Sequence, residues 1–177
     1  YVKAGHYAQA EAYIENLYQT LRHIESLLKI EPPELAAILN VKQEEAKAGR
    51  VEFHWQVNME GDALPLSPED LTHIVGNLLD NALEAAKSNS SPRVDLTLTC
   101  GGLGLELKVS NNGNPIPQDV KHNIFASGYT TKDSKRHSGL GLYIIKQIID
   151  CHNGRLELRE PENYPGVEFY IYIPWND

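Results

Sequence analysis

The chain has 177 residues with 16 Lys or Arg and 24 Asp or Glu, so its formal net charge is −8. This length suits one well-buried core with a small appendage, and the acidic balance argues against a general nucleic-acid or anionic-membrane surface. The sequence contains no signal peptide and no run of about 18 apolar residues, so we expect no membrane span within it. Cys100 and Cys151 lack metal-site spacing and are expected to be buried thiols in a reducing, cytosolic compartment, although one disulfide is also compatible with the sequence.

Apolar residues near the N-terminus recur at alternating spacings of three and four. They are Tyr7, Ala10, Ile14, Leu17, Leu21, Ile24 and Leu28. This spacing predicts a helix with a bundle or coiled-coil seam. Pro32 and Pro33 end the helix, because proline lacks a backbone donor and restricts the residue before it. We therefore divide the chain into a helical unit at 1–31 and a second unit at 32–177.

The second unit alternates helical and strand patterns. Ser67 is expected to cap a helix with Pro68 in its first turn, and His54 is expected to face solvent from a half-buried strand. The predicted elements are a helix at about 34–47, a strand at 51–58, a helix from 68, a hairpin of strands at 94–100 and 103–109 turning at Gly101-Gly102, a helix at about 140–152 stopped by Asn153-Gly154, and strands near 156–158 and at 167–173. Together they predict an α/β fold, a two-layer α/β sandwich with a mixed sheet of about five strands and helices on one face.

Two asparagines interrupt the apolar pattern of the helix that begins at 68. Asn77 and Asn81 are four residues apart, so their amides project from one helical face. They lie at the edge of an apolar stripe of Leu71, Val75, Leu78, Ala82 and Ala85. Burying an unpaired amide costs a few kcal/mol, so both side chains need polar partners. An isolated pair of this kind more often caps loops or faces water, and other features must give it weight.

Two further segments could surround a ligand. In the turn at 110–117, Asn111 offers an acceptor and a donor to a purine edge, and Gly113 is expected to adopt positive φ and let a ligand approach. The segment 124–142 has a local positive charge just before a helix opened by glycines. Its residues are Lys132, Lys135 and Arg136 beside Asp133, then Ser138, Gly139 and Gly141. Helix N-terminal amides with nearby lysines suit phosphate oxygens, although each segment alone also fits an ordinary turn or a solvated loop.

Other phosphate-binding and catalytic patterns are absent from the sequence. Gly139-Leu-Gly141 lacks the third glycine of a dinucleotide fingerprint, and no G-x-x-x-x-G-K-[ST] motif occurs. There is no G-x-S-x-G elbow, and the seven histidines lack zinc-ligand spacing. Nucleophilic hydrolases and metallohydrolases are therefore disfavoured.

Four ordered motifs resemble the nucleotide-binding boxes of the superfamily that contains gyrases, chaperones, histidine kinases and mismatch-repair ATPases. They are Asn77-x-x-x-Asn81, Ser-Asn-Asn-Gly-Asn-Pro at 110–115, Ile-Phe-x-x-Gly-Tyr-Thr-Thr-Lys at 124–132 and Ser-Gly-Leu-Gly-Leu at 138–142. The predicted order of helices and strands is similar to the Bergerat-type ATP-binding fold of this superfamily. Among its branches, the chain most resembles bacterial sensor histidine kinases of the citrate/dicarboxylate and peptide-quorum-sensing types.

The resemblance implies ATP and Mg²⁺ as ligands. It places Asn81 on the magnesium ion, Asn77 near the phosphates and Asn111 at the adenine amino group. Magnesium keeps few protein oxygens and shares its shell with phosphates and water, which agrees with a single amide ligand. The residues that the resemblance assigns to cofactor binding are Asn77, Asn81, Asn111, Gly113, Ile116, Ile124, Thr131, Lys132, His137, Ser138, Gly139, Leu140, Gly141 and Leu142.

Departures from the family pattern modify this expectation. Asn111 replaces the usual aspartate, Pro115 replaces a glycine, and Val167 follows Gly166 where threonine is common. An amide lacks the charge-assisted strength of a carboxylate, so weaker or less selective nucleotide binding is expected. Asn77 stands where gyrase-like hydrolases carry a glutamate, and an amide cannot act as a general base, so hydrolysis should be slow.

The resemblance predicts the catalytic ATP-binding part of a sensor histidine kinase. It would transfer the ATP γ-phosphate to a histidine upstream of Tyr1 and then to a response-regulator aspartate. The N-terminal helix resembles the second helix of a dimerisation hairpin, which implies a homodimer in a cytoplasmic domain of a membrane-anchored sensor, with no nucleic-acid partner. The alternatives are a degenerate nucleotide-responsive binding module and a serine kinase resembling anti-sigma factors, although the helical seam speaks against the latter.

Overall fold

The computed structural model describes residues 7–61, 63–121, 123–129 and 139–175 of the chain. Their elements, in chain order, are α1 (Tyr7–Leu27), α2 (Pro33–Ala48), β1 (Glu52–Met59), α3 (Pro68–Ala86), β2 (Arg93–Gly101), β3 (Gly104–Asn111), α4 (Gln118–Lys121), α5 (Gly141–Cys151), β4 (Arg155–Arg159) and β5 (Val167–Ile173). The predicted helices and strands are confirmed in order and approximate position. The short helix α4 lies in a segment that was predicted as loop.

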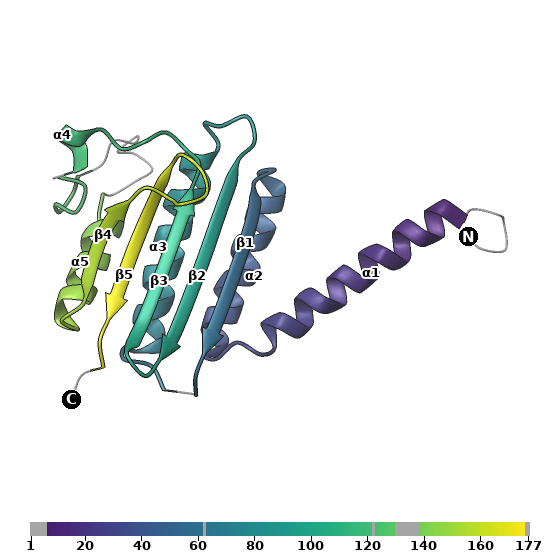
Figure 1. Cartoon of the computed structure of the whole chain (residues 1–177), viewed down its shortest axis with the longest axis horizontal. Coiled ribbons are helices and arrows are strands. Elements are labelled where there is room, and N and C mark those ends of the chain that lie inside the picture. The colour runs from purple at the N-terminus through teal and green to yellow at the C-terminus, as the bar shows by residue number, and fades with distance from the viewer. Residues whose placement is uncertain (1–6, 62, 122, 130–138, 176–177) are drawn as a thin grey trace.

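The strands described here form one five-stranded sheet in the order β1-β2-β3-β5-β4. β1 and β2 are parallel and the other neighbours are antiparallel, so the sheet is mixed as predicted. Helices α2, α3 and α5 cover one face, while the other face is open (Figure 1). The segment 160–166, which links β4 to β5, passes over one end of the open face (Figure 1). The predicted two-layer α/β sandwich is therefore confirmed.

Alternation along the strands sends apolar side chains toward the helices. Leu98 on β2, Leu107 on β3 and Ile171 on β5 are fully buried, and residues one position away on these strands face the open side. On the opposite layer, Leu71 and Leu78 of α3 are fully buried as well. The core lies between the sheet and its helices and excludes water from one face only.

Helix α3 begins where the sequence predicts. The Ser67 Oγ accepts a hydrogen bond from the Asp70 backbone N–H at 3.0 Å, and Pro68 occupies the first turn. This cap satisfies one of the amides that a helix start leaves unpaired. It fixes where α3 begins, and so which of its residues reach the far end of the sheet.

A buried cation joins α2 to α3. The Lys42 side chain is 8% exposed, and its Nζ lies 2.6 Å from Asp80 Oδ1 and 2.7 Å from Glu45 Oε2. Burial alone would lower the pKa of Lys42, but the hydrogen bonds to the two carboxylates outweigh burial and raise this pKa above its ordinary value. The lysine is therefore charged at neutral pH and holds the two helices in register.

Helix α1 extends away from the edge of the sheet at β1 (Figure 1). The predicted seam is exposed along its length, with Ile14 at 63%, Leu21 at 64% and Leu28 at 80% exposure. Apolar burial stabilises a helix of this kind, so an exposed seam indicates a surface that another helix would cover. The division of the chain at residue 32 into two units stays a prediction.

Two local predictions were wrong. The hairpin of β2 and β3 turns at Gly102 and Leu103, because Gly101 pairs with Gly104. Gly104 has φ +130, and a Cβ added there would lie 2.3 Å from the Ile173 carbonyl oxygen. Both thiols are free, but only Cys100 is buried, while Cys151 is exposed near the end of α5.

Among the helices of the described residues, none combines the length and apolar character needed to cross a bilayer.

Candidate functional site

The paired asparagines lie on α3 at the rim of the helical layer. Asn77 and Asn81 are half-buried, beside Leu78 and Ala82, which are fully buried. The Asn77 Nδ2 donates to the His73 carbonyl at 2.8 Å, which leaves its Oδ1 directed outward from this bond. Asn81 also has an interaction partner. The structure thus places two amides on one edge of the core, as the helical spacing predicts.

The first turn of α5 meets the Asn77 side chain. A Cβ added to Gly141 would lie 2.7 Å from Asn77 Oδ1, which is closer than real contacts allow. Leu140, at the N-cap and 40% exposed, makes no side-chain cap bond to α5. The backbone N–H groups of this first turn, which a helix start leaves without intrahelical partners, therefore lie next to the Asn77 Oδ1 of α3. Such N–H groups suit an anion, and the Oδ1 suits a cation that accompanies the anion. A larger residue at 141 would displace the Asn77 side chain.

A tight turn ends β3 at the same end of the sheet. Asn111 is 2% exposed, and its Oδ1 accepts a hydrogen bond from the Gly113 N–H at 2.9 Å. Its amide nitrogen donates to none of the described residues. The expectation of positive φ at Gly113 was wrong, because its φ is not positive. Gly113 is needed instead because a Cβ there would lie 2.4 Å from the Ala85 carbonyl oxygen on α3.

Asn112, which sequence reasoning did not single out, fixes the turn to β2. Its Oδ1 accepts from the Arg93 N–H at 2.9 Å, and its Nδ2 donates to the Ser91 carbonyl at 2.7 Å. Asn89 Nδ2 donates to the Asn112 carbonyl at 3.0 Å. The signal was present in the sequence, because neighbouring asparagines before a glycine commonly bind backbone groups in turns.

The remaining predicted residues divide into two groups. Ile124 is 6% exposed, and Ile116 and Leu142 are half-buried and packed against the hydrophobic core. Gly139 has φ +68, and a Cβ there would lie 2.6 Å from the Gly128 carbonyl carbon. Thr131, Lys132, His137 and Ser138 lie outside the described residues.

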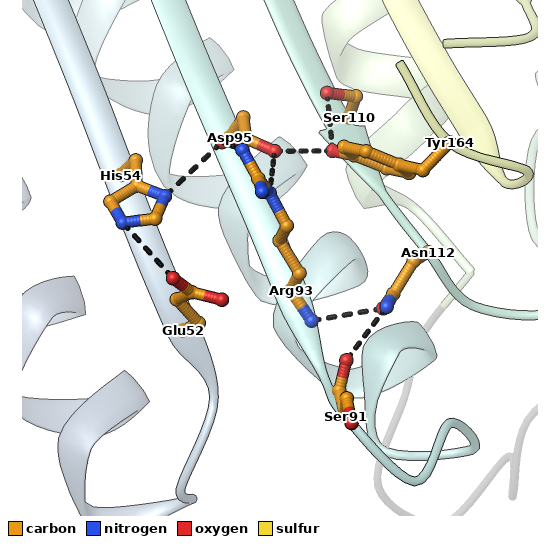
Figure 2. A network of polar contacts seen from close by, with 8 residues as sticks. All are labelled: Glu52, His54, Ser91, Arg93, Asp95, Ser110, Asn112 and Tyr164. Carbon is orange, nitrogen blue, oxygen red and sulfur yellow. Dashed lines mark hydrogen bonds and ion pairs between the residues drawn. The ribbon is translucent and has the colours of Figure 1, made fainter.

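The open face of the sheet carries a polar cluster at this same end, shown in Figure 2. The Tyr164 hydroxyl donates to Asp95 Oδ2 at 2.5 Å and lies 2.9 Å from Ser110 Oγ. Arg93 forms a bidentate pair with Asp95 at 2.8 and 2.9 Å, and His54 lies 3.4 Å from the same carboxylate. Sequence reasoning predicted a solvent-facing His54, which is confirmed, but it missed this cluster because its members are far apart in the chain.

Electrostatics hold this cluster in one protonation state. Burial raises the pKa of Asp95, but the hydrogen bonds from Arg93 and Tyr164 outweigh burial, so this pKa lies below its ordinary value. Burial and the hydrogen bond to Asp95 raise the pKa of Tyr164 to about 12. At neutral pH, the carboxylate is therefore ionised and the phenol remains a donor.

No group of three or more His, Cys, Asp or Glu side chains that could hold a metal occurs among the described residues. A cation at this end of the sheet would therefore depend on amide oxygens and on its ligand's own oxygens. Magnesium fits that donor set, because it prefers oxygen ligands and keeps water and phosphate in its shell.

Comparison with known proteins shows the family of this domain. Residues 66–177 match the family of histidine kinase-, DNA gyrase B- and HSP90-like ATPases. The chain belongs to this family. The match spans α3, the β3 turn, α5 and β5, which include the elements that carry the candidate site.

Within this ATPase family, the relatives are sensor kinases. The chain is 33% identical to the sensor histidine kinase DcuS of Escherichia coli K12, over 96% of this chain and 32% of that protein. It is 32% identical to a probable C4-dicarboxylate sensor kinase of Halalkalibacterium halodurans, over 62% of this chain and 20% of the relative. The chain thus spans a third or less of the length of these relatives.

Solved structures agree. The catalytic domain of the histidine kinase ThkA superposes with a TM-score of 0.66 at 26% identity, covering 82% of this chain and 92% of that one. ThkA in complex with the response regulator protein TrrA matches with a TM-score of 0.63 at 21% identity, over 93% of this chain and 51% of that one, which shows the fold alone. The predicted sensor-kinase class is confirmed: the chain is a histidine kinase-type ATPase catalytic domain, and domains of this family bind ATP.

Proposed function

We propose that this domain binds Mg²⁺-ATP where α3, the β3 turn and α5 meet, and that it donates the γ-phosphate to a histidine of the sensor kinase to which it belongs. The observation that carries the proposal is the close approach of Gly141 to Asn77, with 2.7 Å from an added Cβ to the Oδ1. It brings a helix N-terminus and an amide oxygen together, although they are far apart in sequence. The turn at Asn111 closes the same end of the sheet.

The base would bind at the buried end of this site. Asn111 can accept from the adenine amino group through the second lone pair of Oδ1, because the first accepts from the Gly113 N–H. Ile116, Ile124 and Leu142 would contact the ring faces. Asn111 is nearly fully buried, so its amide binds without competition from water, which compensates in part for the missing carboxylate charge.

The phosphates would lie between α3 and α5. Asn81 would bind the magnesium ion, Asn77 and the amides at Gly139–Gly141 would approach the phosphate oxygens, and Lys132 and His137 would cover them. Bound magnesium would neutralise phosphate charge as the terminal phosphoryl group leaves. At the α3 position where gyrase-like hydrolases carry a glutamate, this chain has Asn77, whose amide cannot take a proton from water. This supports transfer to a histidine, which is itself a nucleophile, over hydrolysis.

The acceptor and the partners belong to the longer protein. We propose that α1 pairs with a helix that carries the acceptor histidine, that two copies form a homodimer through this bundle, and that a response regulator takes the phosphoryl group. The exposed α1 seam supports this part, and a cytoplasmic location follows from the use of ATP. Nothing in the acidic surface supports a nucleic-acid partner.

The kinase proposal is tested on a sensor kinase that contains this chain and its preceding helix. With labelled ATP, we expect acid-labile, base-stable phosphate, and Asn81→Ala should reduce the labelling rate by about a hundredfold, as when one electrostatic contact to transferred charge is lost. Asn58→Ala, an exposed amide on β1, is the matched control and should label normally. Acid-stable phosphate on a partner would overturn the proposal in favour of a serine kinase.

Calorimetric titration separates the kinase from a nucleotide-responsive binding module. We expect ATP and ADP to bind in magnesium with a preference over GTP that is weaker than a carboxylate at 111 would give. Asn111→Asp should therefore tighten ATP binding by about tenfold. ATP binding without any phosphoryl transfer in the longer protein would favour the binding module. Absence of adenine preference at millimolar ligand would contradict the nucleotide site itself.

The dimer proposal is tested by sedimentation of the same protein. Leu21→Asp places a charge in the α1 seam and should shift the protein toward monomer, because a buried charge without a partner is costly. Gln9→Asp adds the same charge to the same helix outside the seam and should leave the dimer intact. Equal behaviour of the two variants would contradict a bundle built on this seam.

A further inference from the structure

The link between β4 and β5 is tied to the sheet through one tyrosine. Tyr164 lies in the segment 160–166, and its hydroxyl donates to Asp95 on β2 at 2.5 Å and lies 2.9 Å from Ser110 on β3. The Arg93 guanidinium lies 5.2 Å from the centre of its ring. Figure 2 shows the tyrosine reaching across the open face to both strands. A single side chain thus connects the link to two strands of the sheet.

Asp95 is itself held firmly. Its bidentate pair with Arg93 fixes the carboxylate plane, since a guanidinium donates two parallel hydrogen bonds. The Arg93 backbone in turn binds the turn residue Asn112, by its N–H to Oδ1 at 2.9 Å. Arg93 of β2 therefore binds both the carboxylate that anchors Tyr164 and the turn that follows β3.

At its C-terminal end, the 160–166 link packs closely against the backbone of Asn111. A Cβ added to Gly166 would lie 2.0 Å from the Asn111 carbonyl oxygen, and Val167 pairs with Asn111 in the register of β3 and β5. Ser110, the neighbour of Asn111, is the residue that Tyr164 contacts. Moving the link would consequently move the residue whose side chain faces the proposed base.

Packing holds the link to the β3 turn at Gly166 but not along its whole length. A cavity of about 410 Å³ separates it from the β3 turn, bordered by Asn112, Gly113, Tyr164 and Gly166 among others. Across this space the two segments make no van der Waals contacts, and they meet only beyond it, where Gly166 packs against Asn111. The hydrogen bonds of Tyr164 restrain the rest of the link.

We propose that Tyr164 is a positioning residue for the nucleotide site: by tying the 160–166 link to Asp95 and Ser110 on the open face, it fixes Gly166 and Val167 against Asn111 on the covered face. The inference rests on the proposed function, and it adds a residue that would not touch the nucleotide. It also gives the open face of the sheet a part in ligand binding on the opposite side.

Tyr164→Phe tests the proposal on the whole chain, because it removes the hydroxyl and keeps the ring. Tyr170→Phe is the matched control: Tyr170 is on the same face and its hydroxyl donates to Glu106 at 2.9 Å, away from Asn111. We expect Tyr164→Phe to raise the Mg²⁺-ATP dissociation constant about threefold to tenfold, the range typical of residues that act without touching a ligand. Tyr170→Phe should change it less than twofold.

A second readout reports the position of Asn111 directly. The Gly113 amide donates to Asn111 Oδ1, so its NMR resonance in the nucleotide-free protein should move in Tyr164→Phe and stay in place in Tyr170→Phe. Ser110→Ala, which breaks only the second contact of the hydroxyl, should move it in the same sense and serves if Tyr164→Phe does not fold.

The outcomes separate this inference from the proposed function. If the unaltered chain binds no ATP, the proposed function fails, while the Gly113 resonance still tests the coupling. If the chain binds ATP but Tyr164→Phe and Tyr170→Phe have equal dissociation constants, or if the Gly113 resonance does not respond, Tyr164 is no positioning residue. Equal losses of thermal stability in both variants with unequal affinities would support the proposal, because a merely structural role would lower both alike.

Discussion

The two faces of the sheet are stabilised by different interactions. On the helix-covered face, Leu98, Leu107 and Ile171 are fully buried, and their burial is the main source of stability. On the open face, the same strands carry Asp95 and Lys108, which pair with charged neighbours at partly exposed sites. Pairs of this kind contribute little individually, because water solvates the separated charges well. The covered face therefore supplies most of the stability of the fold, and the polar pairs of the open face add only small contributions to it.

The proposed nucleotide site lies at the edge where the covered face and the open face meet. Asn111 belongs to the covered face, yet its neighbours Ser110 and Asn112 are bound by polar groups of the open face and of the β2 start. At such an edge, core packing holds the backbone rigid, and the polar contacts fix the positions of individual side chains. The difference between the faces can be measured on a single strand.

The largest expected contrast is between neighbouring residues of β3. Leu107→Ala should lower the free energy of unfolding by about 3 kcal/mol, because it leaves a cavity in a fully buried position. Lys108→Ala, on the open face, removes a pair with Glu106 in which both side chains are 40% exposed and should cost about 0.5 kcal/mol or less. Urea unfolding of both variants measures the ratio, and comparable losses would show that the open face is structural after all.

The covered face explains why most of the fold could be predicted. Apolar alternation in β2, β3 and β5 and the Ser67 cap are local signals, since each records which side of one element is buried. The parallel pairing of β1 with β2 and the open-face cluster depend on contacts between distant segments, such as Tyr164 with Asp95. No local sequence pattern indicates contacts between distant segments, so these contacts could not be predicted from the sequence.

A smaller effect is expected where the turn of β3 touches α3. Gly113→Ala would place a Cβ 2.4 Å from the Ala85 carbonyl oxygen, so we expect a loss of about 1–3 kcal/mol, as for overpacked cores, together with weaker ATP binding. Gly102→Ala, in the open turn where an added Cβ meets nothing within 4 Å, is the matched control and should be nearly neutral. Calorimetric unfolding with and without ATP distinguishes the two, and a neutral Gly113→Ala would contradict this close contact.

The site could be predicted only in part, for a physical reason. Asn77, Asn81 and Asn111 were singled out because amides are unusual in apolar patterns and because four motifs occur in family order. The prediction of why residue 113 is glycine was wrong. Close approach to Ala85 and positive φ both favour glycine, so the sequence alone does not distinguish them. Tyr164 left no signal, since a tyrosine in a loop is ordinary until its partners on β2 and β3 are known.

The smallest expected effect is a pH dependence of the open face. The pKa of Tyr164 is raised to about 12 in the folded protein, whereas a tyrosine in an unfolded chain titrates near 10. The folded state keeps a proton that the unfolded chain loses, so the contribution of Tyr164 is fully present below pH 10 and is lost as the pH rises through 12. Tyr164→Phe should thus cost about 1 kcal/mol at pH 8, and its difference from the unaltered chain should shrink steadily between pH 10 and 11.5 in urea unfolding. Thr99→Ala, an exposed open-face change that removes no titrating group, should differ from the unaltered chain by the same amount at every pH. A Tyr164→Phe difference that stays constant over this interval would mean that the phenol does not donate to Asp95 in solution, and the open face would then lose its proposed connection to Asn111.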